Sequence, residues 1–127
     1  MIHADSQPDP FLTRFTNGDQ IASSDTTVDK GGGSRGFRPH ELLEAALATC
    51  MNMTLRMSAQ KLDLPLSGAS VSVSLNREQP ESPTFVYRIQ LHGSLTDEQR
   101  RELLARVENC PVRTTLSKGL RFEAETD

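Results

Sequence analysis

Residues 39–62 read PHELLEAALATCMNMTLRMSAQKL, and this stretch decides the fold. After Pro39 it contains neither Gly nor Pro, and it is rich in Leu, Ala, Met and Glu, which favour a helix. Proline suits the first helical position, because its missing N–H would be unpaired there anyway. Apolar residues cover this helix well beyond a single stripe, so we expect it to be buried on several sides. In so small a chain, this predicts a central helix with a sheet on one side and another subunit on the other.

The composition agrees with a helix that one chain cannot cover alone. The chain has 127 residues, of which 35% are hydrophobic and 5% aromatic, and it has no Trp. This length predicts one domain over residues 1–127. So thin a core indicates either partial disorder or an interior completed by a partner chain. The charge balance does not favour wholesale disorder.

The charge balance also argues against two classes of partner. Lys and Arg number 14 and Asp and Glu number 17, a net charge of −3, so there is no basic excess for phosphate contacts or an anionic membrane surface. We therefore expect no nucleic-acid and no membrane partner. Residues 1–8 lack the cationic start and apolar run of a signal peptide, and no stretch of about 18 apolar residues is present. We expect a cytoplasmic protein, in which a structural disulfide between Cys50 and Cys110 is not favoured.

The rest of the chain has clear local signals. The dipeptide Asn17-Gly18 is typical of a hairpin turn, and Thr96 followed by Gln99 is typical of a helix capping box. Residues 1–10 are expected to be a loose lead-in. The glycine-rich run over 31–36 lacks the ending of a phosphate-binding loop and is interpreted as a linker.

These signals predict an α+β fold. Alternation of apolar and polar residues marks a second hairpin after the central helix. The expected elements, in chain order, are strands over 11–16 and 20–24, the central helix, strands over 69–75 and 85–91, a helix over 96–109, a short helix over 112–117 and an edge strand over 120–125.

Two cysteines are the candidates for chemistry. Cys50 lies in the central helix, and Cys110 ends the second long helix directly before Pro111. Their wide separation excludes the close CxxC pairing of zinc ribbons and thioredoxin-type sites, and the scattered histidines complete no ligand set, so no metal site is predicted. A cysteine on an apolar helix face is read equally well as an inert small hydrophobic residue. A reactive thiolate needs a nearby cation or helix N-terminus. The cations closest in sequence are Arg38, Arg56 and Arg113.

Both cysteines fall within motifs of a known family. Residues 39–55, PHELLEAALATCMNMTL, resemble the pattern P-x-E-L-L-x-A-A-L-x-x-C-x-x-M-T-L of the OsmC/Ohr superfamily, named after osmotically induced protein C and organic hydroperoxide resistance protein. The second motif of that family, C-P-V followed by a short helix, is similar to residues 110–116, CPVRTTL. The helix-to-strand passage over 61–69 is similar as well. The resemblance extends over residues 11–125 and is greatest to the OsmC-like branch.

This resemblance implies an α+β subunit in which an antiparallel sheet packs on a long buried central helix and on a second helix. It also implies an intertwined homodimer with two active sites at the subunit interface. In members of the family the first cysteine, here Cys50, attacks the O–O bond of a hydroperoxide as a thiolate and becomes a sulfenic acid. The second, here Cys110, condenses with it to a disulfide, which an external dithiol reduces. No cofactor and no metal are implied.

Two positions depart from the peroxidase branches of the family. Those branches carry Glu directly after the proline, where this chain has His40, with Glu41 one place later. Successive helical residues point about 100° apart, so the shift changes direction as well as position. The same branches place an Arg beside the first hairpin turn, where this chain has Asn17. We expect Arg38 to be the cation that favours the Cys50 thiolate, with Glu41 or His40 orienting it. Other candidates for this cation are Arg14 and Arg35.

Three hypotheses of function follow. The leading one is a thiol-dependent hydroperoxide reductase with Cys50 as nucleophile and Cys110 as resolving residue. The second is a dimeric binding module without turnover, whose interface pocket, lined by Met51, Met53 and Met57, holds an apolar ligand or a thiol. The third is a redox sensor or disulfide carrier that uses the same cysteines with a protein partner.

Overall fold

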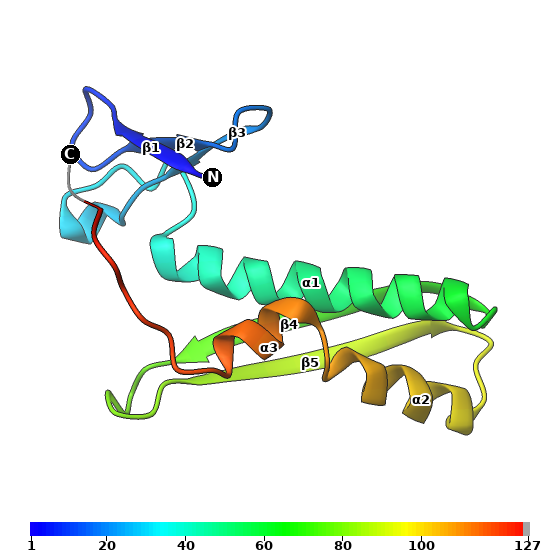
Figure 1. Cartoon of the computed structure of the whole chain (residues 1–127). Coiled ribbons are helices and arrows are strands. Elements are labelled where there is room, and N and C mark those ends of the chain that lie inside the picture. Colours follow the sequence, from blue (N-terminus) through cyan, green and yellow to red (C-terminus); the bar gives the residue numbers. More distant parts are fainter. Residues whose placement is uncertain (126–127) are drawn as a thin grey trace. The chain divides into compact units, whose positions relative to one another are not determined.

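The computed structural model describes residues 1–125, and the chain separates into two compact units, Met1–Leu43 and Glu44–Asp127. The boundary between the units falls inside the central helix, and the single domain expected over residues 1–127 stays a prediction. The α+β order is the one expected from the sequence (Figure 1). The elements are β1 (His3–Ser6), β2 (Thr13–Thr16), β3 (Ile21–Ser24), the 3-10 turn η1 (Val28–Lys30), α1 (Pro39–Lys61), β4 (Leu66–Asn76), β5 (Thr84–Gly93), α2 (Asp97–Val107) and α3 (Pro111–Leu116).

The first unit contains a three-stranded antiparallel sheet in the order β1–β2–β3. The hairpin predicted from Asn17-Gly18 is confirmed, and Asn17 holds its turn, since its Oδ1 accepts hydrogen bonds from the N–H groups of Asp19 (2.9 Å) and Gln20 (2.8 Å). The loose lead-in predicted for residues 1–10 is wrong for residues 3–6, because β1 pairs with β2 along its whole length. All four residues of β1 are exposed, so no alternation of apolar side chains marks this strand in the sequence.

A buried carboxylate fixes the course of the glycine-rich linker after β3. Asp25 is only 3% exposed. Its carboxylate accepts hydrogen bonds from the N–H groups of Thr26 (2.7 Å), Gly33 (3.0 Å) and Arg35 (3.2 Å). Because two of these donors lie eight and ten residues further along the chain, Asp25 closes the loop onto the end of the sheet.

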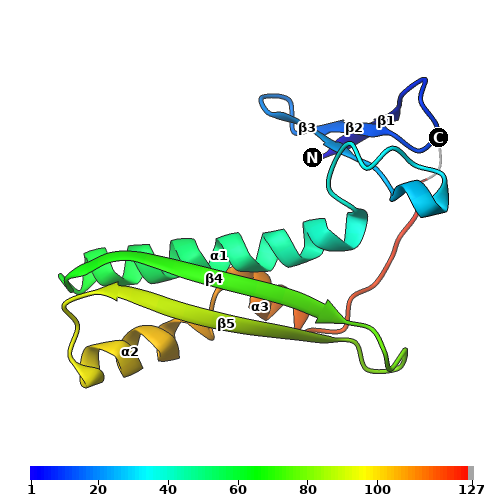
Figure 2. The same cartoon turned by 180° about the vertical axis from the view of Figure 1, so that it is seen from behind.

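In the second unit, three helices lie on one face of the β4–β5 hairpin (Figures 1 and 2). The strands pair antiparallel from Asn76 opposite Thr84 to Leu66 opposite Gly93. Along the paired stretch, half-buried and exposed side chains alternate in both strands, as the sequence predicts. Gly93 has a φ of +133°, and a Cβ there would lie 2.2 Å from the carbonyl oxygen of Pro65, so the hairpin needs glycine at this position.

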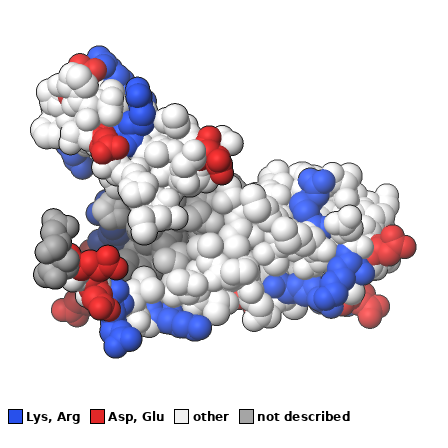
Figure 3. Space-filling view, turned by 45° about the horizontal axis from the view of Figure 1, so that its top comes forward, with Lys and Arg blue, Asp and Glu red and all other residues white. Residues whose placement is uncertain are grey.

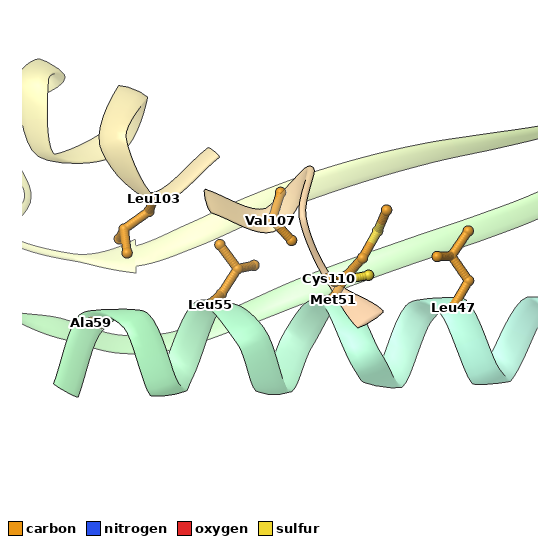
Figure 4. Close-up of a cluster of buried hydrophobic side chains, with 7 residues drawn as sticks. All are labelled: Leu47, Met51, Leu55, Ala59, Leu103, Val107 and Cys110. Carbon is orange, nitrogen blue, oxygen red and sulfur yellow. The ribbon is translucent and has the colours of Figure 1, made fainter. Parts of the chain in front are cut away.

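The core of the second unit forms around side chains spaced four apart on α1. This spacing places them in one row on the helix. The core residues are Leu47, Met51, Leu55 and Ala59 from α1, Leu103 and Val107 from α2, and Cys110 (Figure 4). Burying each of the large aliphatic side chains stabilises the fold by about 1.5–3 kcal/mol. The other side of α1 is open in the single chain, where Met53 is 58% and Met57 66% exposed.

The C-terminal elements agree with the sequence up to residue 116. The capping box of α2 is confirmed, since Thr96 and Gln99 exchange side chain to main chain hydrogen bonds of 3.1 and 2.9 Å. The short helix predicted next is α3. The edge strand predicted over 120–125 is wrong, because the structure describes no strand there. A strand forms only where a neighbouring edge pairs with its N–H and C=O groups, and apolar composition alone does not supply that edge.

The surface carries charges of both signs. On the face seen in Figure 3, Lys and Arg side chains are intermixed with Asp and Glu, and no broad field of one sign is visible there. Among residues 1–125, no helix combines the length and the apolar composition needed to cross a bilayer.

Asp25→Asn should lower the stability of the first unit at neutral pH. Burial acts to raise the pKa of Asp25, but the N–H groups of Arg35, Thr26 and Gly33 favour its carboxylate and hold the pKa below its usual value. Such a group stabilises the fold above its unfolded-state pKa, and this contribution is lost as the pH falls through its folded-state pKa.

Urea unfolding of Asp25→Asn and of the natural chain measures this difference as a function of pH. The gap between their midpoints should be largest at neutral pH and shrink in acid. Asp19→Asn, on the exposed hairpin turn, is the matched control. A gap that does not change with pH would show that the charge of Asp25 does not stabilise the loop.

Candidate redox site

The two cysteines meet at the start of α3. Cys110 directly precedes this helix, and its Sγ accepts a hydrogen bond from the N–H of Arg113 (3.4 Å), as an N-cap residue does. The Sγ of Cys50, from the middle of α1, accepts a hydrogen bond from the N–H of Val112 (3.5 Å). Pro111 fills the first helical position, where no N–H is needed. Two successive N–H groups of one helical turn therefore hold the two sulfur atoms, and both thiols are free.

The surroundings of the two thiols differ. Cys110 is completely buried, whereas Cys50 is half-buried. Burial raises the pKa of the Cys110 thiol, and the hydrogen bond and the charge of Cys50 raise it further. The N–H of Arg113 acts in the opposite direction and lowers this pKa. Burial therefore favours the neutral form of Cys110, and Cys50 is the more exposed of the two residues.

Two polar side chains fix the rotation of α1 and with it the direction of Cys50. The Nδ2 of Asn52 donates to the carbonyl oxygen of Ala69 (2.7 Å), and the Oε2 of Glu44 accepts from the N–H of Leu75 (2.7 Å). Both main-chain groups belong to β4, which, among residues 1–125, pairs with β5 and leaves its other edge open. The contacts lie eight residues apart on α1, on either side of Cys50, so the helix cannot turn about its axis without breaking them.

A cavity of about 180 Å³ lies between α1, β5 and α3. Leu47 lies one helical turn before Cys50 on α1. Arg113 lies in the first turn of α3, the helix that Cys110 caps. The lining is mostly apolar, with one cation, and consists of Leu47, Phe85, Tyr87, Arg113, Leu116 and Ser117.

The pocket predicted for a binding module lies at a subunit interface and stays a prediction, but the structure removes Met51 from its lining. Met51 is a core residue with no exposed surface, whereas Met53 and Met57 are exposed. Side chains two residues apart on a helix point about 200° apart, so Met51 and Met53 cannot line one cavity in the same chain.

The remaining predicted site residues lie in the first unit. Glu41, in the first turn of α1, accepts a hydrogen bond from the N–H of Arg38 (2.8 Å) and forms an ion pair with the Arg38 Nε (3.2 Å). The hydrogen bond from the Arg38 N–H is the main cause that lowers the pKa of Glu41, and the bond from the Arg38 side chain lowers it further. The structure therefore brings Arg38 and Glu41 together, as it brings Cys50 and Cys110 together. His40 is exposed.

The other arginines considered are placed differently. Arg14 and Arg56 are exposed, and Arg35 forms an ion pair with Asp9. Arg113, also considered for its place in the sequence, is the arginine whose main chain contacts a cysteine sulfur. Sequence reasoning did not find the roles of Glu44, Asn52 and Val112. Their partners are main-chain atoms or a sulfur far along the chain, and no residue pattern marks such contacts.

Metal binding finds no support in the described part of the chain. Among residues 1–125, no group of three or more His, Cys, Asp or Glu side chains is placed to hold an ion.

The OsmC-like protein family model matches residues 31–125. The chain belongs to this family. The solved structure of an OsmC-like protein from Mycoplasma pneumoniae is similar over 91% of this chain and 85% of that one, with a TM-score of 0.76 and 19% identity. The organic hydroperoxide resistance protein of Bacillus subtilis has a TM-score of 0.62 and 18% identity, over 92% of this chain and 89% of that one. The organic hydroperoxide resistance protein of Legionella pneumophila has a TM-score of 0.66 and 20% identity, over 92% of this chain and 88% of that one.

At these identities the similarity to solved structures shows the fold. The resemblance inferred from the motifs and the predicted α+β fold are thereby confirmed. No curated protein matches the chain.

The buried Cys110 thiol predicts a loss of stability in alkali. Because its pKa is raised in the folded state, the unfolded chain releases this proton first as the pH rises. The stabilisation is fully present below the unfolded-state pKa and is lost as the pH rises through the folded-state pKa. Urea unfolding under reducing conditions, from neutral to alkaline pH, measures the slope. Cys110→Ala should flatten it.

Val107→Ala is the matched control for this measurement, because it also truncates a completely buried side chain but removes no titrating group. It should lower the free energy of unfolding at every pH by a similar amount. If Cys110→Ala kept the alkaline slope of the natural chain, Cys110 would not be its source.

Proposed function

We propose that the protein is a thiol-dependent peroxidase that reduces organic hydroperoxides or hydrogen peroxide. The observation that carries the proposal is the placement of an accessible Cys50 and a buried Cys110 on successive N–H groups at the start of α3. Membership of the OsmC-like family and the fold shared with organic hydroperoxide resistance proteins support it. The burial of Met51 in the core removes one of the three methionines that the binding-module hypothesis uses.

The proposed reaction has two chemical steps. The Cys50 thiolate attacks the outer oxygen of the hydroperoxide, the O–O bond breaks, and Cys50 becomes a sulfenic acid while the alkoxide takes up a proton to leave as the alcohol. Cys110 then attacks the Cys50 sulfur; the S–O bond breaks, the disulfide forms, and the hydroxyl leaves as water with the proton of Cys110. An external dithiol reduces the disulfide. We place this cycle in the cytoplasm, where such reductants are present.

Arg38 and Glu41 have roles in this proposal too. The Arg38 guanidinium is the cation that favours the Cys50 thiolate, and the Glu41 carboxylate, bonded to it, orients it. Because its pKa is lowered, Glu41 keeps its charge and its ion pair well into acid. His40, exposed beside them, is the alternative orienting or acid–base residue.

We also propose that the protein acts as a homodimer. All the buried apolar side chains of residues 1–125 lie in the second unit. Five large apolar side chains of the first unit are between 59% and 70% exposed, namely Ile2, Phe11, Ile21, Val28 and Phe37. Together with Met53 and Met57 on α1, this is more exposed apolar surface than a small monomer usually carries. A second copy of the chain, as in the family's dimers, would bury it.

Reduced protein mixed with cumene hydroperoxide or hydrogen peroxide tests the peroxidase. The natural chain should lose both thiols and consume one peroxide per subunit in the absence of reductant. Cys50→Ser should abolish peroxide consumption, because the nucleophile is gone. Cys110→Ser should consume peroxide and leave a sulfenic acid on Cys50 that dimedone traps. Thiols that stay unchanged in prolonged excess peroxide would exclude the catalytic cycle and return the choice to a binding protein.

Arg38→Gln examines the cation in the same assay. It should slow the oxidation of Cys50 by about tenfold or more, which corresponds to about 1.4 kcal/mol of the barrier. Arg88→Gln, on the exposed face of β5, is the matched control. Equal rates in the two variants would remove Arg38 from the proposed site.

The dimer predicts a clear effect of Met57→Glu. If α1 packs against a second copy, burial of Met57 contributes about 1.5–3 kcal/mol, and a carboxylate in its place weakens association by roughly a hundredfold or more. Sedimentation of the natural chain should show a dimer, and the variant should shift toward the monomer. Gln60→Glu, exposed near the end of the same helix, is the control for charge alone. A natural chain that sediments as a monomer at all concentrations would contradict the proposal.

A further inference from the structure

We infer that Arg113 is a positioning residue that holds Cys110 in place to form the disulfide with Cys50. The inference deepens the proposed function and rests on it, since disulfide formation is the second step of that cycle. Arg113 is distinct from the cation expected near Cys50, and the pattern of residues that suggests the family does not include it.

Arg113 contacts both ends of the short segment over residues 108–110, which connects α2 to α3. Its main-chain N–H donates to the Cys110 Sγ (3.4 Å), and its Nη1 donates to the carbonyl oxygen of Glu108 (2.8 Å). Glu108 is the C-cap residue of α2. One arginine therefore bridges the end of α2 and the start of α3, with Cys110 between them. A hydrogen bond from a charged donor is stronger than one between neutral groups, so this bridge is well suited to fix the corner.

The bridge connects the sulfur atoms to the core. α2 is anchored by Leu103 and Val107, which are completely or almost completely buried. The guanidinium attaches the first turn of α3 to the end of α2, and that turn carries the N–H groups that hold both Cys50 and Cys110. When this turn shifts, the two sulfurs no longer keep the alignment that attack of one on the other requires.

Other main-chain bonds hold the segment when the guanidinium is removed. The N–H of Asn109 donates to Arg106 (3.1 Å), and that of Cys110 to Val107 (3.0 Å). Loss of the Arg113 side chain should therefore change the rate at which the disulfide forms and leave the fold intact.

Rapid mixing with dithiobis-nitrobenzoate, an aromatic disulfide that releases a coloured thiolate, separates the two thiol reactions without peroxide. The Cys50 thiolate attacks the reagent and expels a first coloured thiolate, at a rate that rises with reagent concentration. Cys110 then attacks the Cys50 sulfur of the mixed disulfide, the Cys50–Cys110 bond forms, and a second coloured thiolate leaves at a rate independent of concentration. Cys110→Ser should retain the first release and lose the second.

Arg113→Met should slow the second release by about tenfold and leave the first unchanged, because the first does not involve Cys110. Arg113→Lys retains a charged donor for Glu108 and should recover part of the rate. Arg101→Met, which removes an exposed arginine of α2, is the matched control and should match the natural chain in both phases.

Two results would overturn the inference: a second release as fast in Arg113→Met as in the natural chain, or an equal slowing of both releases, which marks a general disturbance. A second experiment, in which peroxide replaces the aromatic disulfide and dimedone traps sulfenic acid on Cys50, distinguishes this inference from the proposed peroxidase function. Longer-lived sulfenic acid in Arg113→Met supports both. If peroxide leaves Cys50 unoxidised while the coloured releases behave as expected, the peroxidase fails and the positioning of Cys110 by Arg113 stands.

Discussion

The buried row on α1 is the contact on which the second unit depends, because the hairpin and α2 pack against it to form the core. Cys110 belongs to this core and also caps α3, so the packing that stabilises the unit places one of the two sulfurs. In the proposed cycle this sulfur also has to react with that of Cys50, so packing is not the only demand on the residue. A small buried thiol satisfies both demands where a larger apolar side chain would not.

Cys50 is placed by a different kind of interaction. It is half-buried, and its direction follows from the rotation of α1, which Glu44 and Asn52 fix through the edge of β4. An edge strand leaves main-chain groups that need partners, and here α1 supplies two of them. The site therefore combines a thiol held by apolar packing with one held by polar bonds. This division accounts for their different exposure, and it gives the more accessible position to the thiol proposed to meet the substrate.

The sequence was sufficient for β4, β5, the three helices and both cysteines, because each leaves a local pattern, such as alternation over 69–75 and 85–91, uninterrupted helix formers after Pro39, and two motifs in register. It was insufficient where a contact joins a side chain to a distant main-chain atom. Asp25 is one such case, since its partners are N–H groups, which every residue but proline offers. The assignment of Met51 to a pocket was wrong for another reason: composition shows that α1 is apolar all round but does not show which face the core of one chain takes.

The glutamate that the peroxidase branches carry directly after the proline is displaced by one place in this chain, and the start of α1 gives a physical explanation. A carboxylate three residues after the cap position reaches back to its N–H, and Glu41 makes this bond to Arg38. A carboxylate in the place of His40 would be one residue too early for it. The same Glu41 oxygen pairs with the guanidinium, so one carboxylate caps the helix and holds the cation. An exposed ion pair of this kind adds little to stability. The cap therefore accounts for Glu41 whatever the protein does, and the ion pair follows from the same placement of its carboxylate.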